Sequence, residues 1–281
     1  MLERIFEYTY LQHAVLACLF SSIVCGIIGV VIIEKKLIMM SGGIAHTAYG
    51  GVGLGYLLNI EPIIGAFIFA LASALGIGSI KRRGGPKTDV IIGLLWSFGM
   101  ACGVFFIGLR KGYAPDIDSY LFGNILSVST TDIYLMLALS AVIIIVITAF
   151  FPYWKAYLFD EEFAAVKGIN TVLLEYMLLV LISMAVVVLI RSVGIILVMA
   201  LLTAPAATAS LFTKKLKNRM VYAVILSLLF TVSGLFISYY LNIQSGATIV
   251  FVSVVIYFTS YVIRESFQKH KGCRNITNKL A

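Results

Sequence analysis

Charged residues are scarce in this sequence of 281 residues. Only 12% are Asp, Glu, Lys or Arg and 61% are hydrophobic, whereas a soluble domain carries about 25% charged residues. So few polar side chains cannot cover the surface of a water-soluble fold. The apolar residues gather in runs of about 20, the length that crosses a bilayer as a helix. We therefore expect an all-α, polytopic transmembrane helical bundle, because helices satisfy their own backbone hydrogen bonds in lipid.

Catalytic motifs are also missing. The sequence contains no GxxxxGK[ST] phosphate loop, no HExxH zinc motif and no GxSxG nucleophile elbow. The four cysteines, Cys18, Cys25, Cys102 and Cys273, fit no zinc or redox spacing, and three lie in apolar runs, so we expect small core residues. We predict a protein that is not an enzyme. If ATP drives its activity, another chain must bind the nucleotide.

The hydrophobic runs divide the chain into about nine spans. They cover residues 11–33, 37–58, 63–80, 88–109, 132–151, 172–190, 194–213, 220–240 and 246–263. Two links are short, at 59–62 and 191–193, and the number falls to eight if one of these pairs is a single element. The first run lacks a basic n-region, so we expect it to be retained. Residues 1–281 then form one transmembrane domain, with a tail over 264–281.

Basic residues alternate between the loops in a way that predicts orientation. With the N-terminus outside, 17 of the 21 Lys and Arg residues face the cytoplasm together with seven acidic residues. The inner face then carries a net charge of +10 and the outer face −2, as the positive-inside rule expects. The C-terminal tail is therefore predicted to be cytoplasmic. Because topology and anionic lipid at the inner leaflet explain the basic balance, no nucleic-acid partner is expected.

The second span is rich in small residues and contains a histidine. Small side chains let a neighbouring helix approach closely, and two of its glycines have GxxxG spacing. His46 lies about 14 Å into this span, where an ionisable group usually faces a cavity, a pathway or a partner. We consider two interpretations, a metal ligand and a hydrogen-bonded packing residue. The small residues that could line a pathway are Ser41, Gly42, Gly43, Thr47, Gly51 and Gly55.

The seventh span contains an internal proline. Pro205 removes a helical hydrogen bond and predicts a kink, and Ala204 and Thr208 lie on a small-residue stripe at i, i+4 spacing. A kinked, closely packed helix could form a pathway wall or a moving part, although membrane helices also tolerate proline without such a role. Met199 is a weaker metal-ligand candidate, since its thioether suits soft ions.

The longest inner loop, 151–170, contains a short amphipathic segment. Its expected apolar face carries Phe159, Phe163 and Val166, and its helix is predicted to start at acidic residues and to close at Lys167 and Gly168. Such a helix could dock a soluble partner or lie on the lipid surface. The full docking surface that we predict is Phe159, Asp160, Glu161, Glu162, Phe163, Ala164, Lys167 and Gly168.

Several segments together resemble one known family, the manganese, zinc and iron permeases of bacterial and archaeal ABC transporters. The resemblance is carried by EKKLIMMSGGIAHTAYGGVGLGY (34–56), DVIIGLLWSFGMACGV (89–104), DSYLFGNIL (118–126), FDEEFAAVKGI (159–169), VGIILVMALLTAPAATA (193–209) and YYLNIQSGATIVF (239–251). His46 matches the histidine of the family's Asp-x-x-x-His metal pair, but Gly42 stands where the aspartate is expected. Gln244 replaces a usual proline.

The resemblance implies a permease in the cell membrane that imports a divalent transition metal. Its expected partners are two cytoplasmic ATP-binding subunits, an extracytoplasmic metal-binding protein and a second permease chain in a homodimer. No permanently bound cofactor is implied, and 159–169 would be the segment that couples to the ATPase. The alternatives are a permease for chelated iron, which usually needs more spans, and a secondary cation transporter, which usually carries several intramembrane carboxylates.

Overall fold

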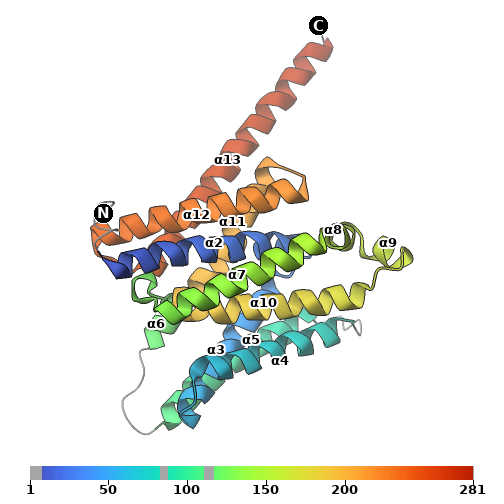
Figure 1. The fold of residues 1–281 in the computed structure, drawn as a ribbon. Coiled ribbons are helices and arrows are strands. Elements are labelled where there is room, and N and C mark those ends of the chain that lie inside the picture. Colours follow the sequence, from blue (N-terminus) through green and yellow to red (C-terminus); the bar gives the residue numbers. More distant parts are fainter. Residues whose placement is uncertain (1–7, 83–87, 111–116, 281) are drawn as a thin grey trace.

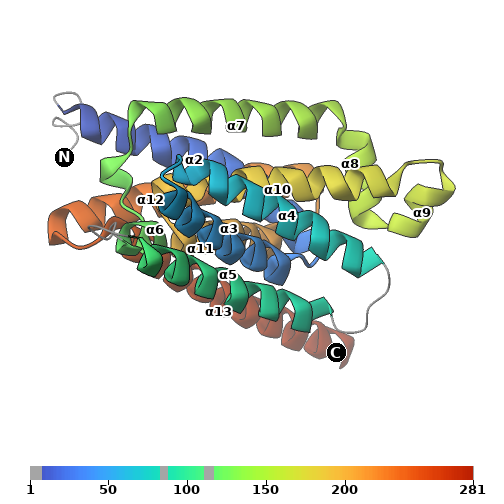
Figure 2. The same cartoon turned by 90° about the horizontal axis from the view of Figure 1, so that it is seen from below.

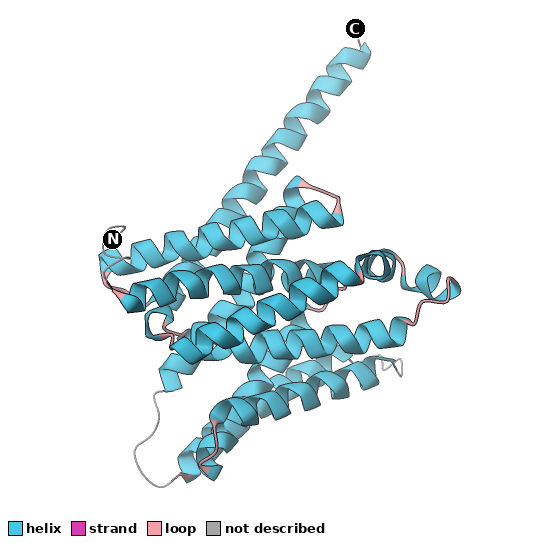
Figure 3. Cartoon of the chain, in the orientation of Figure 1, coloured by secondary structure: helices cyan, strands magenta, loops and turns pink. Residues whose placement is uncertain are grey.

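The computed structural model describes residues 8–82, 88–110 and 117–280. In this part of the chain every regular element is a helix and no strand occurs (Figure 3). The long helices are α2 (Thr9–Glu34), α3 (Ile38–Leu58), α4 (Pro62–Arg82), α5 (Thr88–Leu109), α7 (Thr130–Ala149), α10 (Thr171–Val193), α11 (Ile195–Phe212), α12 (Leu216–Leu241) and α13 (Ser245–Leu280). The short ones are α6 (Ile117–Phe122), η1 (Ile125–Ser127), α8 (Phe151–Phe159) and α9 (Glu161–Val166). The prediction of an all-α polytopic bundle is confirmed.

Eight of the long helices in the described residues are long and apolar enough to cross a membrane. The helix that is not among them is α3, although it has 21 residues. Its glycine, serine, threonine and histidine residues lower its hydropathy. The described residues thus contain eight candidate spans, where about nine were expected with eight as the alternative, and α3 is a ninth long helix that does not meet the same length and hydropathy test.

Both short links are true breaks between helices. After α3, Asn59 adopts a left-handed conformation with φ of 53°, and α4 begins at Pro62. Between α10 and α11 only Gly194 intervenes, with φ of 82° and ψ of 157°. An L side chain rarely adopts this conformation, so glycine permits the two helices to follow each other directly.

The helices are arranged with α2, α10 and α11 near the centre. Figure 1 shows α12, α2, α7 and α10 side by side, and Figure 2 shows α3, α4 and α5 grouped on one side of them. In the most apolar stretches of α2 and α10, 67% of residues are buried, compared with 17% in α13. The helix α13 continues without interruption to Leu280 and projects away from the bundle (Figure 1). The predicted tail over 264–281 is therefore, as far as 280, a continuation of the last spanning helix.

Candidate functional site

The α3 helix contacts its neighbours through glycine. A Cβ atom added to Gly55 would lie 2.7 Å from the Cα of Pro62, and one added to Gly51 would overlap the backbone of Gly65 in α4. On the other side, a Cβ on Gly99 of α5 would lie 2.8 Å from the carbonyl oxygen of His46. The backbones of α3, α4 and α5 therefore touch, as the small residues of α3 predicted.

This close approach places His46 against a tryptophan. The imidazole stacks on the indole of Trp96 in α5, with 4.1 Å between ring centroids and 18° between planes. Its Nδ1 is buried and has no hydrogen-bond partner among the described residues. A buried imidazole nitrogen without a partner is unfavourable, whereas a metal ion passing this position would supply one. The structure thus does not show the hydrogen bond that the packing interpretation requires at Nδ1.

Gly42 lies one helical turn before His46. A Cβ atom at this position would lie 2.8 Å from Cζ3 of Trp96 and 3.0 Å from Cε of Met199 in α11. These two side chains therefore occupy the space into which a side chain at position 42 would extend. Trp96 thus contacts His46 and lies beside Gly42, and Met199 lies beside Gly42 as well. The sequence indicated Gly42, His46 and Met199 as candidates but not Trp96.

The hydroxyl groups of the other pathway residues donate hydrogen bonds within their own helices, and that of Thr47 also lies 3.3 Å from the carbonyl oxygen of Leu95 in α5. Ser41 donates to the carbonyl of Ile38 at 2.8 Å, Thr47 to that of Gly43 at 2.7 Å and Thr208 to that of Ala204 at 2.7 Å. Gly43 lies against Ile92 of α5, since a Cβ on this glycine would be 3.0 Å from Ile92 Cγ2. These residues shape the helix surfaces, and their role in a pathway stays a prediction.

The helix that carries Ala204, Pro205 and Thr208, α11, packs mainly against helices other than α3. Pro205 lies inside α11, which packs chiefly against α2, α12 and α13, whereas α3 packs chiefly against α4 and α5. Ala204 and Pro205 are buried. The neighbouring Ala206 faces α2, because a Cβ on Gly29 would lie 3.3 Å from its Cβ. Of the candidates on α11, Met199 is the one shown next to the α3 site.

Metal-binding groups are sparse around this site. The described residues contain no cluster of three or more His, Cys, Asp or Glu side chains that could hold an ion. Cys18 and Cys25 are buried free thiols and Cys102 is partly buried, as expected for core residues. One imidazole and one thioether are the candidate ligands that the structure places near Gly42, and two such neutral groups would hold a divalent ion only weakly.

The predicted docking segment, residues 159–168, begins at the last residue of α8 and contains α9. Asp160 caps α9, its Oδ1 accepting a hydrogen bond from the backbone N–H of Phe163 at 3.0 Å, and Gly168 ends the turn with φ of 78°. The apolar side chains of this face are exposed, Phe159 by 93% and Val166 by 87%. Phe159 terminates α8 and is not part of the α9 helix, a boundary that the spacing alone did not reveal.

Ala164 corrects the predicted docking surface. It is fully buried, so it fastens α9 to the rest of the protein and does not present itself to a partner. Alternate sides of a six-residue helix differ in exposure, and periodicity could not tell which side would face inward. The exposed residues of the predicted surface are Phe159, Asp160, Glu162, Phe163, Lys167 and Gly168, and Val166 beside them is exposed too.

An ion pair ties α9 to the turn before α3. Lys35 Nζ lies 2.7 Å from Glu161 Oε2 and 3.5 Å from the centroid of the Tyr157 ring in α8. Burial raises the pKa of Tyr157, so the ring stays neutral and attracts the ammonium group through its π face. The sequence places Glu161 at the helix start and on the predicted docking surface but does not indicate its pairing with Lys35. The basic pair Lys35 and Lys36 at the end of α2 was the available signal.

A second charged cluster lies at the opposite end of the bundle. Arg191 lies 2.7 Å from Glu61 Oε1 through Nη1 and 2.7 Å from Asp132 Oδ1 through Nε, so it joins α4, α7 and α10. Nearby, the hydroxyls of Tyr56 and Tyr120 lie 3.0 Å apart beside a cavity of about 270 Å³. Burial raises the pKa of Tyr120. The three charged residues lie far apart in the sequence and form no sequence pattern, so this cluster was not predicted.

Known proteins resemble this chain along nearly its whole length. An uncharacterised membrane protein of Synechocystis is 39% identical over 258 residues, covering 92% of each chain. The manganese transport system membrane protein MntC of Listeria monocytogenes is 34% identical over 261 residues, covering 93% of each. A solved structure, PsaBC from Streptococcus pneumoniae in complex with Fab, matches with a TM-score of 0.86 and 33% identity, covering 96% of this chain and 98% of that one.

The family model of the ABC 3 transport family matches residues 7–264. This range takes in every helix from α2 to α12 and most of the apolar part of α13. The chain is a multi-pass membrane protein of the cell membrane, as its eight apolar helices and its relatives agree. With the helical bundle, the small-residue α3 helix and full-length similarity in place, the chain belongs to the ABC 3 transport family.

Proposed function

We propose that this protein is the membrane-spanning permease of an ATP-driven importer for a divalent transition metal, with Mn²⁺ as the first ion to test. The observation that carries the proposal is full-length similarity to a manganese transport membrane protein, joined to the unpartnered imidazole nitrogen of His46 inside the bundle. Family membership favours an ABC permease over a secondary cation transporter. Zn²⁺ and Fe²⁺ are the other ions expected, and a chelated-iron substrate is the alternative.

The energy source is proposed to lie in other chains. Since this sequence has no phosphate loop, two ATP-binding subunits would bind and hydrolyse ATP, and they would dock on the exposed part of α9. An extracytoplasmic metal-binding protein would deliver the ion, and a second copy of this chain would complete the pathway. The Lys35–Glu161 ion pair would then link movement of α9 to the turn that leads into α3.

The orientation proposed from the basic residues places α9 and the C-terminal tail from residue 264 in the cytoplasm, and the N-terminus outside. The end of the bundle that carries Lys35, Lys81 and Lys214 is then the inner end. Labelling of Cys273 in intact cells tests this arrangement. Reaction with a membrane-impermeant thiol reagent would contradict it, and reaction only after permeabilisation is expected.

The ion would pass His46 as the two halves of a dimer alternate between outward and inward access. A neutral imidazole donates one strong bond to a transition metal, and Met199 could add a weak sulfur contact. Without a carboxylate at position 42, the site would hold the ion less tightly than a His–Asp pair. Weak binding favours release, which a transport site needs.

Uptake measured ion by ion in cells that lack this chain tests the proposal. Restored wild-type permease should raise uptake of one of Mn²⁺, Zn²⁺ or Fe²⁺, and His46→Ala should abolish it per folded permease. Trp96→Leu is the matched control, because it removes the ring stack but leaves the imidazole in place. If both variants lose transport only in proportion to lost protein, His46 is a packing residue.

A further inference from the structure

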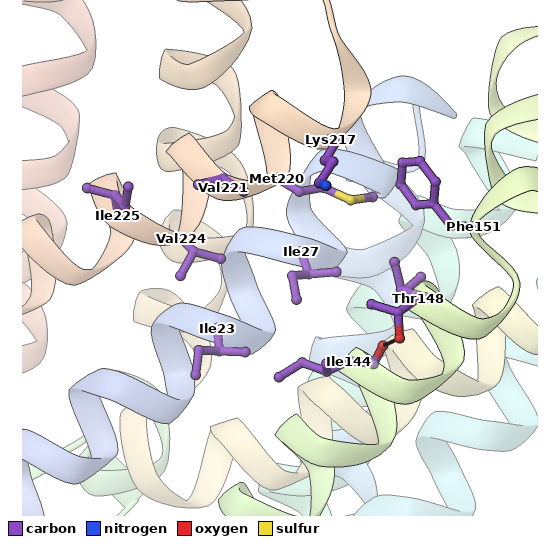
Figure 4. Close-up of a pocket in the computed structure, with 11 residues that line it drawn as sticks. Ile23, Ile27, Ile144, Thr148, Phe151, Lys217, Met220, Val221, Val224 and Ile225 are labelled. Atoms are coloured by element: carbon purple, nitrogen blue, oxygen red, sulfur yellow. Dashed lines mark hydrogen bonds between the residues drawn. The ribbon is translucent and has the colours of Figure 1, made fainter.

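An apolar groove runs along the outside of the bundle over α2, between α7 and α12. Figure 4 shows Ile23 and Ile27 of α2, Ile144 of α7 and Val221 of α12 pointing into it. Its volume is about 560 Å³. Thr148 is a polar wall residue, but its hydroxyl donates to the carbonyl oxygen of Ile144 at 2.6 Å. The walls of this groove thus offer an occupant almost nothing but hydrocarbon.

One end of the groove opens into a basic hollow. The two spaces share Phe151 and Lys217, and the second has a volume of about 870 Å³. Its other basic side chains are Lys155, Lys214, Lys215, Arg219 and Arg264. Arg219 is neutralised by an ion pair with Glu34, which also lines the hollow. Among the described residues, no ion pair neutralises the four lysines.

We propose that the groove and the basic hollow together bind one anionic phospholipid of the inner leaflet. An acyl chain fills the groove, and the phosphate lies among the ammonium groups of Lys155, Lys214 and Lys217. The orientation proposed above places this basic end at the cytoplasmic surface, where anionic lipids gather. The occupant must therefore be apolar over the length of the groove and negative at one end, which a phospholipid is.

The same features disfavour other occupants. A transmembrane helix gains little hydrophobic free energy by leaving lipid, and it associates through small or polar residues; the groove walls are formed by branched aliphatic side chains. A free phosphate would use the lysines but leave the groove empty. The bound lipid would also brace Phe151, the first residue of α8, which leads directly to α9.

Lipid binding by the delipidated full-length permease in detergent tests this proposal. Phosphatidylglycerol and phosphatidylcholine with identical acyl chains are titrated, and bound lipid is counted by native mass spectrometry. Phosphatidylglycerol should bind at least about tenfold more tightly than phosphatidylcholine, a difference of about 1.4 kcal/mol. Lys217→Glu should reduce that preference at least about fivefold. Lys36→Glu makes the same charge change at an exposed turn on this end of the bundle and should leave it unchanged.

The apolar part is tested by filling the groove from opposite walls. Val221→Trp on α12 and Ile144→Trp on α7 should each displace phosphatidylglycerol, while Val104→Trp, on the exposed face of α5, should not. Equal affinity for the two lipids, or unchanged binding in both groove variants, would overturn the proposal. Competition by free glycerol phosphate at the concentration of the lipid would assign the lysines to a soluble anion and overturn it equally. These readouts do not depend on metal transport, so they can fail separately from the proposed function.

Discussion

The side of the bundle formed by α3, α4 and α5 differs from the side formed by α2, α7 and α12 in how the helices associate. On the first side, backbones touch at Gly51, Gly65 and Gly99. On the second, α12 also meets α2 closely at Gly26, but α7 and α12 leave between them, over α2, a groove walled mainly by isoleucine and valine. Lipid solvates large apolar side chains as well as protein does, so apolar character alone does not close a membrane interface. Close association requires small residues, and the region beside His46 has them.

The largest expected effect comes from adding a large side chain to the side formed by α3, α4 and α5, called the close side below. Gly51→Leu should abolish folding, because even a Cβ at this position overlaps the backbone of Gly65 and backbone cannot move aside cheaply. Gly76→Leu on α4 is the control, since nothing lies within 4 Å of its Cβ position. Size-exclusion profiles of the solubilised proteins measure the result. Monodisperse Gly51→Leu protein would show that the two helices do not pack this tightly.

The second-largest effect is expected from shortening an isoleucine, which should destabilise the α3 side more than the groove side. Ile44→Ala, in α3, should lower the free energy of unfolding by about 2–5 kcal/mol, because Ile44 is fully buried and its loss leaves a cavity. Ile144→Ala should cost less than about 1 kcal/mol, since Ile144 is 40% exposed and lipid can fill the space. Thermal denaturation in the same detergent compares the pair. Equal losses would mean that the groove is as tightly packed as α3.

Gly42→Asp probes the metal site within the close side. The added Cβ would meet Trp96 and Met199, so the single variant should lose about 1–3 kcal/mol of stability from overpacking. Combining it with Trp96→Leu should restore stability and create a His–Asp pair that binds Mn²⁺ more tightly, since carboxylates prefer hard ions. Calorimetric titration with Mn²⁺ measures this. No gain in affinity in the stable double variant would argue against metal contact at His46.

The smallest effect is expected at the connection between the close side and α9. Lys35→Met should weaken this connection by about 0.5–1 kcal/mol, because Glu161 is partly exposed and water screens the pair. A double-mutant cycle with Glu161→Gln isolates the interaction, measured as metal uptake per ATP hydrolysed. Lys36→Met, at the exposed neighbouring residue, is the matched control. Additive effects of the two substitutions would mean that the Lys35–Glu161 ion pair does not contribute to coupling between ATP hydrolysis and metal uptake.

Much of the fold followed from hydrophobic run length. The sequence predicted a span at 63–80, and the helix runs from Pro62 to Arg82; it predicted 172–190, and the helix runs from Thr171 to Val193. Each helix in lipid satisfies its own backbone hydrogen bonds, so its position can be predicted from a run of consecutive residues. The boundary between α8 and α9 at Asp160 was harder to predict, since both short helices lie in one inner loop.

The arrangement around the site could not be predicted in the same way. Trp96 reaches His46 because Gly99 sets how α5 lies against α3, and that register depends on contacts between residues far apart in sequence. The burial of Ala164 and the two ion pairs of Arg191, with Glu61 and with Asp132, also depend on contacts between residues far apart in sequence. His46 itself was identifiable, because an imidazole in the middle of a small-residue span is unusual.

Gly194 alone connects α10 to α11, so this joint between the two helices is as short as a link can be. One residue separates two spanning helices, and a single residue reaches at most about 3.5 Å, so the adjoining helix ends cannot slide apart. Movement of α11 relative to α10 is restricted to rotation about the backbone bonds next to this residue. The joint lies at the end of α10 opposite α9. Met199 lies five residues beyond it, so the direction in which Met199 lies relative to α10 is set by the backbone conformation of Gly194.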